Sequence, residues 1–367
     1  MAEAINHKML RCAIIGIEHM HISSLYSSLA KFTDEVEFIG WADSPCPDDQ
    51  DHEKKARGSL GKGYDSLKYY PDWLALAAER PDLALVCADN TAHCEVACKL
   101  MSMGISVVLE KPMATTYSDA KKIYDTYASR DVKLAVNWPI AWFPSFNKAK
   151  ELCDAGTIGQ IMRVTYRSPA TWGPFSYSKD GNLPPVEELE KTWWYRHERG
   201  GGSILDYACY GTALSTWFFG RRAKSAWGIK NSFAPEAKET GVEDFSAMLY
   251  DFGGGIGLLE GSWSTYNCGE IPSGPIIHGT MGTIVCDRHS NLLKLYTGRA
   301  HGHIPPTEVI ECPRSTPELD FGRNMIDHMT SGAPLHPLLT PDLNLSVMAA
   351  LDAGRRSAES GGTPTES

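Results

Sequence analysis

Three side chains suited to proton transfer fall at two places in the chain. Lys111 follows a short apolar run within the sequence Glu-Lys-Pro, and open α/β sheets bind ligands where their parallel strands end. Asp206 and Tyr210 follow three consecutive glycines and are four residues apart, so a helix would place the carboxylate and the phenol on one face. A tyrosine takes a proton near neutral pH only when a cation stabilises the phenolate, and Lys111 could be that cation. Taken singly, a solvated lysine and a packed helix tyrosine explain these residues as well.

A glycine turn near the N-terminus offers a second kind of chemistry. Gly16 ends an apolar run and begins Gly-Ile-Glu-His-Met-His, where a phosphate-binding turn usually reads G-x-G-x-x-G. Glu18 and His21 stand where glycines are expected, and the charge of Glu18 would repel a phosphate. Asp43 ends the next apolar run, where a carboxylate can bind both ribose hydroxyls and repel a 2′-phosphate. The pattern predicts NAD rather than NADP, although Asp43 also suits an ordinary turn or helix cap.

Two histidine pairs and one cysteine pair have spacings that could ligate a metal. His19/His21 and His301/His303 each have i, i+2 spacing, but no third ligand is evident in the sequence, which favours loop histidines. Cys94 and Cys98 lie one helical turn apart and are expected to be buried thiols. We therefore predict no metal.

An aromatic segment flanks the three glycines. Its tryptophans suit the CH-rich face of a sugar ring, and core packing is the alternative. The predicted substrate-binding residues are Trp172, Trp194, Arg196 and His197.

The elements that position these residues follow from hydrophobic periodicity. Apolar runs alternate with amphipathic stretches up to about residue 137, which indicates a doubly wound parallel sheet covered by helices on both faces. The predicted strands are 10–16, 36–43, 83–89, 105–110 and 132–137, and the predicted helices are 21–31, 71–80, 92–103 and 117–129.

The pattern changes after Trp138. A helix is expected at 145–155, a strand at 161–168 and a further helix from the three glycines onward. Short alternating runs between 223 and 311 predict a mostly antiparallel open sheet, and helices at 317–331 and 341–359 precede a tail that we expect to be frayed. The predicted domains are 1–138, which binds a dinucleotide, and 139–367, which binds substrate and forms oligomers, with final helices that could pack back on the first domain.

Composition narrows the class of protein. Hydrophobic residues make up 43% and charged residues 22% of the 367 residues, which is typical of a globular protein. The net charge of −10 disfavours nucleic acid as a partner. No apolar stretch is long enough to span a membrane, and no export signal is evident. Ten sparse cysteines then indicate reduced thiols and a cytoplasmic protein.

Taken together, these motifs resemble the glucose–fructose oxidoreductase, inositol dehydrogenase and rhizopine-catabolism superfamily, abbreviated Gfo/Idh/MocA. Asn90 to His93 are similar to its P-N-x-x-H, Glu110-Lys111-Pro112 to its E-K-P, and the glycine-led helix to its G-G-G-x-L-x-D-x-G-x-H, with Tyr210 replacing the helix histidine. The resemblance implies a Rossmann-type domain followed by an α+β domain, and a nicotinamide-dependent enzyme acting on sugars, polyols or glycosides. It implies catalysis by Lys111, Asp206 and Tyr210. When the glycine turn and Asp43 are included, the implied cofactor-binding residues are Gly16, Glu18, His19, Asp43, Asn90, His93, Glu110 and Lys111.

The predicted function is hydride transfer between NAD and a secondary alcohol of a sugar-like substrate by a homodimer or homotetramer. Two alternatives remain open at this stage. One is an NAD-assisted glycosidase or eliminase that retains its cofactor, and the other is a catalytically silent nucleotide or sugar sensor.

Overall fold

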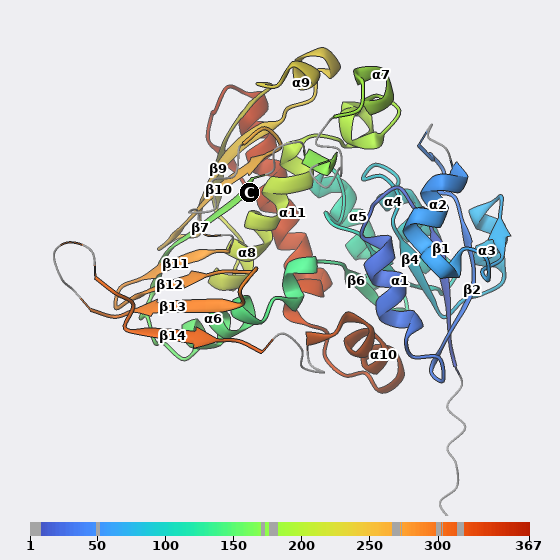
Figure 1. Ribbon diagram of the computed structural model, residues 1–367, viewed down its shortest axis with the longest axis horizontal. Coiled ribbons are helices and arrows are strands. Elements are labelled where there is room, and N and C mark those ends of the chain that lie inside the picture. The colour runs from blue at the N-terminus through green and yellow to red at the C-terminus, as the bar shows by residue number, and fades with distance from the viewer. Residues whose placement is uncertain are drawn as a thin grey trace, which may run out of the picture.

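The computed structural model describes residues 9–48, 52–169, 173–175, 183–265, 272, 274–298, 302, 304–313 and 319–367. Figure 1 shows a smaller lobe, coloured blue, beside a larger sheet coloured green to orange, with the long red helix α11 (Pro341–Glu359) between them. None of the described helices is long and apolar enough to cross a bilayer.

The first lobe is built on a six-stranded parallel sheet. Its strand order is β3-β2-β1-β4-β5-β6, so the first strand lies in the middle and the chain winds outward in both directions. Every residue of β4, β5 and β6 is buried, as expected for strands covered on both faces. The strands are β1 (Leu10–Ile15), β2 (Val36–Ala42), β3 (Tyr69–Tyr70), β4 (Leu83–Val86), β5 (Ser106–Leu109) and β6 (Leu134–Val136).

Five helices connect these strands. The hydroxyl of Thr116 and the carboxylate of Asp72 accept hydrogen bonds from backbone N–H groups at the starts of α5 and α3, which fixes where those helices begin. The sequence did not predict α2, since it is mostly polar and exposed, nor the two-residue strand β3. The helices are α1 (Ile22–Ala30), α2 (His52–Leu60), α3 (Trp73–Ala78), α4 (His93–Ser102) and α5 (Tyr117–Ala128).

The second sheet has nine strands in the order β14-β13-β12-β11-β7-β10-β9-β8-β15. Only β7 and β10 pair in parallel, and the other neighbours are antiparallel. With the parallel Rossmann-type sheet, this confirms the predicted fold class. The strands are β7 (Ile161–Pro169), β8 (Ser225–Asn231), β9 (Phe245–Asp251), β10 (Ile256–Ser262), β11 (Ile276–Gly279), β12 (Thr283–Cys286), β13 (Leu292–Tyr296), β14 (Glu308–Glu311) and β15 (Thr365–Glu366).

The prediction of a frayed C-terminal tail is wrong. Thr365 and Glu366 pair with Ala226 and Ser225 at the edge of the sheet. This pairing uses backbone groups, so the polar side chains of the tail gave no sign of it.

The remaining helices follow β6 in the chain, and α6, α8 and α11 pack against the second sheet. The glycine-led helix begins with a five-residue π-helical turn, Ile204–Ala208, and continues as α8 (Cys209–Phe219). The others are α6 (Pro144–Asp154), α7 (Val186–Leu189), α9 (Pro235–Thr240), α10 (Phe321–Ser331) and α11, with 3-10 turns at Gly61–Gly63, Pro139–Trp142, Gly173–Phe175, Trp193–Tyr195, His197–Arg199 and Pro337–Leu339.

Helix α11 contacts both lobes, and α10 packs on α1 of the first lobe. The N–H of Gly322 in α10 donates to the Ser28 hydroxyl of α1 at 2.9 Å. In α11, Asn344 accepts from the Trp138 indole at 2.7 Å, and Ser357 accepts from the N–H of Gly228 in β8 at 3.0 Å. Side chains of α11 therefore join the two lobes, while α10 packs on the first.

Candidate active site

Lys111 and Asp206 form a buried ion pair between the two lobes. The Lys111 Nζ donates to the Asp206 Oδ1 at 2.9 Å and to its carbonyl oxygen at 2.8 Å. Lys111 lies directly beyond β5, and Asp206 sits in the π-helical turn. The Trp263 indole donates to the other Asp206 oxygen, Oδ2, at 3.1 Å. The carboxylate is thus held in place from both sides.

Charge balance in this pair favours a protonated lysine. Burial lowers the pKa of Lys111, but the Asp206 carboxylate together with the other acidic groups around the lysine outweighs burial and holds that pKa well above its usual value. Two of the three Lys111 N–H bonds are used by Asp206. No acceptor among the described residues takes the third, which leaves it for an oxygen of a bound molecule.

Tyr210 joins the pair through its ring. The Lys111 Nζ lies 4.7 Å from the centroid of the Tyr210 ring, a cation–π contact, and the Trp138 ring packs edge-on against it at 5.7 Å. Burial raises the pKa of Tyr210 well above its usual value, and this outweighs the opposing effect of Lys111. The net direction is opposite to the one expected from the sequence, because burial of the phenol is not visible there.

The glycine turn passes very close to the end of β4. Gly16 has a φ of +79°, and a Cβ there would lie 2.8 Å from the Ala88 nitrogen, so only glycine fits. The same Cβ would lie 2.6 Å from the Glu18 Oε2, which means that the Glu18 carboxylate folds back over Gly16. Glu18 is buried, its Oε2 has no hydrogen-bond partner among the described residues, and burial raises the pKa of this carboxyl to about 8.

Asp43, Asn90 and His93 end up at the same edge of the parallel sheet. Asp43 accepts a hydrogen bond from the Tyr69 hydroxyl at 2.6 Å. Asn90 donates to the carbonyl of Gly200 at 2.8 Å, while its Oδ1 is buried with no partner in the described part of the chain. The His93 ring nitrogens lie 3.0 and 3.2 Å from backbone carbonyls at 112 and 88, so this histidine ties the ends of two strands together.

The structure supplies the third ligand that the sequence did not show beside His19 and His21. The Glu110 Oε1 lies 2.7 Å from the His21 Nδ1 and 3.8 Å from the His19 Nδ1. Asn137 donates to the other Glu110 oxygen at 2.7 Å. Burial raises the pKa of Glu110, but the neighbouring His21 and Lys111 and the hydrogen bonds outweigh it and lower that pKa.

A segment of the second lobe closes over this edge. The Arg199 Nε donates to Asp89 at 2.9 Å and one of its terminal nitrogens to Asp48 at 3.1 Å. The Trp193 indole donates to the carbonyl of Glu18 at 3.2 Å. Since Asp48 follows β2 and Asp89 follows β4, Arg199 spans the carboxyl end of β1 between them. Sequence reasoning missed Arg199, although it directly precedes the three glycines.

The predicted substrate-binding residues are placed differently from one another. Trp194 is buried and stacks on Trp193 with ring centroids 4.9 Å apart. Arg196 pairs with Glu198 at the surface, and His197 lines a cavity of about 310 Å³ with residues of both lobes. Trp172 lies outside the described residues.

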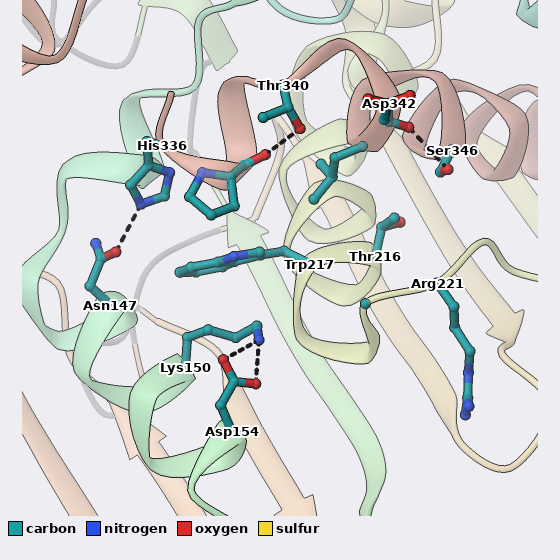
Figure 2. A pocket seen from close by; sticks show the side chains of 13 residues that line it. Asn147, Lys150, Asp154, Thr216, Trp217, Arg221, His336, Thr340, Asp342 and Ser346 are labelled. Atoms are coloured by element: carbon teal, nitrogen blue, oxygen red, sulfur yellow. Dashed lines mark hydrogen bonds and ion pairs between the residues drawn. The ribbon is translucent and has the colours of Figure 1, made fainter. Parts of the chain in front are cut away.

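A second cavity, of about 600 Å³, lies away from these residues, between α6, α8 and α11 (Figure 2). The Trp217 ring lies along it, with His336 on one side and the Lys150–Asp154 ion pair on the other. Neither cavity is lined by Lys111 or Asp206, which are 1% and 5% exposed. The ion pair is therefore enclosed in this conformation.

Two protein-family models match the two parts of this chain. Residues 10–138 match the model of an oxidoreductase family with an NAD-binding Rossmann fold, and residues 146–285 match the GFO/IDH/MocA C-terminal domain. The chain belongs to the Gfo/Idh/MocA family. Its first lobe is accordingly the NAD-binding domain of that family.

Characterised members of the Gfo/Idh/MocA family are similar in part. The levoglucosan dehydrogenase of Pseudarthrobacter phenanthrenivorans is 22% identical over 58% of this chain and 57% of its own. The D-glucoside 3-dehydrogenase of Escherichia coli is 26% identical over 48% of this chain and 49% of its own. The chain thus spans about half the length of these relatives.

Solved Gfo/Idh/MocA structures share the whole fold. A levoglucosan dehydrogenase in complex with NADH and levoglucosan has a TM-score of 0.76 and 18% identity, covering 98% of this chain and 99% of its own. The WlbA dehydrogenase of Bordetella pertussis, in complex with NADH and UDP-GlcNAcA, has a TM-score of 0.73 and 18% identity, covering 98% and 99%.

The described residues fit NAD at three points. Gly16 gives the close approach of turn and strand that a dinucleotide-binding turn needs. Asp43 stands at the end of β2, where a ribose would lie, and the buried Asn90 Oδ1 lacks a partner that a bound molecule would supply. Glu18 is the poor match, because its carboxylate covers Gly16.

Asp43→Ser should reduce the preference for NAD over NADP by at least about tenfold. A hydrogen bond to a charged group contributes about 1.5–3 kcal/mol, and the substitution also removes the charge that repels a 2′-phosphate. Dissociation constants of both nucleotides, measured by fluorescence titration, give the ratio. Tyr69→Phe is the control, since it removes only the hydroxyl that donates to Asp43. It should leave the ratio of the NAD and NADP dissociation constants unchanged. Equal binding of NAD and NADP by the unmodified protein would contradict the role of Asp43.

Glu18→Gly should tighten NAD binding by about two- to fivefold, comparable to other interactions at a helix N-terminus, because it uncovers the Gly16 backbone for the cofactor phosphates. Glu18→Gln, which keeps a side chain of similar size over Gly16, should give a smaller gain. Calorimetric titration of the three proteins with NAD measures both effects. Weaker binding by the glycine variant would mean that Glu18 supports the turn rather than opposing the cofactor.

Proposed function

We propose that the chain is an NAD-dependent oxidoreductase that transfers a hydride to or from a secondary alcohol carbon of a sugar, polyol or glycoside. The observation that carries this proposal is the buried Lys111–Asp206 pair at the carboxyl edge of the parallel sheet, with one lysine N–H left over. The sugar dehydrogenases among the relatives support the substrate class.

The residues of the chain have distinct tasks in this reaction. The remaining Lys111 N–H donates to the substrate oxygen, carries the proton to or from it, and stabilises its developing negative charge. Asp206 positions the ammonium by holding two of its donors. NAD, when bound, supplies the redox chemistry.

A two-step experiment tests the proposal. Mass spectrometry of the purified protein identifies any co-purified nucleotide, and absorbance at the reduced-nicotinamide band then screens sugars, inositols and glycosides. Conversion of free NAD with a sugar supports the dehydrogenase. Bond cleavage without net NADH formation would instead support the glycosidase or eliminase, and nucleotide binding with no turnover on any compound would support a sensor.

We also infer that the chain forms a homodimer or homotetramer through the open face of its second sheet. Trp227, Leu249 and Leu258 are neighbours across β8, β9 and β10, and Ile229 and Leu258 are 52% and 42% exposed. A contiguous apolar surface of this kind favours association. Light scattering after size exclusion measures the oligomer size. The free state of the described cysteines suits a cytoplasmic location.

A further inference from the structure

Three metal-ligating side chains converge beside the lysine pair. His19 and His21 belong to the turn after β1, and Glu110 directly follows β5. Their ligand atoms all lie within 4.8 Å of one another. Tetrahedral zinc with bonds of about 2.0–2.1 Å to nitrogen and oxygen separates its donors by roughly 3.3 Å. The two distances from Glu110 Oε1, 2.7 Å to His21 and 3.8 Å to His19, lie on either side of that value. Small side-chain shifts would therefore bring the three donors around one ion.

The carboxylate is already oriented for this role. The Asn137 amide donates to the Glu110 Oε2 at 2.7 Å, which leaves Oε1 turned toward the two imidazoles. Such an outer hydrogen bond is typical of carboxylates that ligate metals. Lys111 does not compete for the same space, because Asp206 draws its ammonium away.

His19 gives a second, independent indication. The residue is 2% exposed, and its Nδ1 is the ring nitrogen that faces Glu110. Its Nδ1 receives only a long contact, 3.4 Å, from the N–H of His21. The rings of His21 and Trp193 lie 4.4 and 5.7 Å away and hold it in place. A buried imidazole with so little hydrogen bonding is costly unless something else binds it.

We propose that His19, His21 and Glu110 bind one divalent ion of the zinc class, which prefers imidazole and carboxylate donors. Three protein ligands leave a coordination position for water or for a substrate oxygen, as in catalytic rather than structural zinc sites. The proposal concerns metal binding and does not depend on the proposed reaction. The competing explanation is a hydrogen-bonded His21–Glu110 pair that never takes a metal.

Metal binding is tested on the full chain without a polyhistidine tag. The protein is stripped with a chelator, dialysed, and titrated calorimetrically with Zn²⁺ alone, and the metal content is measured by mass spectrometry. Co²⁺ is then added in place of Zn²⁺, because its visible absorption bands report the geometry of the ligands. We expect one ion per chain, bound at micromolar concentration or below, and a rise in melting temperature with Zn²⁺.

Matched variants decide between the two explanations. His21→Ala and Glu110→Gln should each weaken Zn²⁺ binding by at least about a hundredfold, and Asn137→Ala, which removes only the outer hydrogen bond, by about tenfold. His289→Ala removes an exposed histidine elsewhere and should change nothing. His19→Gln serves if an alanine variant does not fold, as judged by circular dichroism. Absence of a stoichiometric ion, or equal affinity in His21→Ala and the unmodified protein, would overturn the proposal.

Discussion

Replacing Lys111 with methionine should lower turnover by about a hundred- to ten-thousand-fold, the usual cost of losing a positioned acid or base. Methionine has a similar length but offers no N–H to the substrate oxygen. The measurement is the initial rate on a sugar identified by the absorbance screen, together with NAD affinity from fluorescence titration. NAD affinity should change little, so the loss should appear in kcat. Turnover within about threefold of the unmodified protein would remove Lys111 from the proposed chemistry.

Tyr210→Phe is the companion variant, because it separates the ring from the hydroxyl. The contact of the ring with the Lys111 ammonium is kept. Burial raises the pKa of the phenol well above its usual value, so the hydroxyl stays neutral near pH 7 and a phenylalanine should keep turnover within about tenfold. A loss of a hundredfold or more would instead assign proton transfer to the hydroxyl, as the sequence alone suggested.

Arg199→Leu should lower the free energy of unfolding by about 3 kcal/mol, the low end of the cost of breaking a buried ion pair. The side chains of Asp48 and Asp89 are 1% and 0% exposed, so both would lose a buried cation. The low end applies because Asp48 keeps Lys55, and Asp89 keeps its hydrogen bonds from the start of α4. Urea unfolding followed by tryptophan fluorescence measures the change.

Arg57→Leu is the control for this experiment. Arg57 pairs with Glu53 and Asp65, all three of them exposed, and exposed ion pairs contribute about 0–1 kcal/mol. If Arg199→Leu costs no more than Arg57→Leu, the segment at 193–199 is not held on the first lobe by its arginine.

The parallel sheet was predictable because its strands are buried on both faces and therefore read as continuous apolar runs. The candidate lysine and the turn glycine could be found because each sits next to such a run. Helix α2 was missed because most of its residues are charged or small, and its position depends on contacts with α1 rather than on a periodic apolar face.

The contacts within the site were harder to predict. His21 and Glu110 are 89 residues apart, and Arg199 and Asp89 are 110 apart. Neither pair has a local sequence pattern. One signal was available: residues that follow β1 and β5 of a parallel sheet meet at the same edge, so Glu110 was a candidate third ligand for the two histidines. No sequence pattern indicated that Tyr210 would be buried, so the rise in its pKa could not be predicted.

The contacts of α10 and α11 with the first lobe have a consequence for building chimeras between relatives. Exchanging everything after Trp138 as one block would replace Gly322, which approaches α1 so closely that a Cβ there would lie 2.0 Å from the carbonyl oxygen of Ser28. It would also replace Asn344, the hydrogen-bond acceptor of the buried Trp138. The first lobe of the recipient protein would then pack against helices whose contact residues come from the donor protein. Because β15 and Ser357 of α11 also pair with β8 of the second sheet, a transplanted second lobe should keep its own α11 and β15, with Gly322 and Asn344 retained where they contact the first lobe.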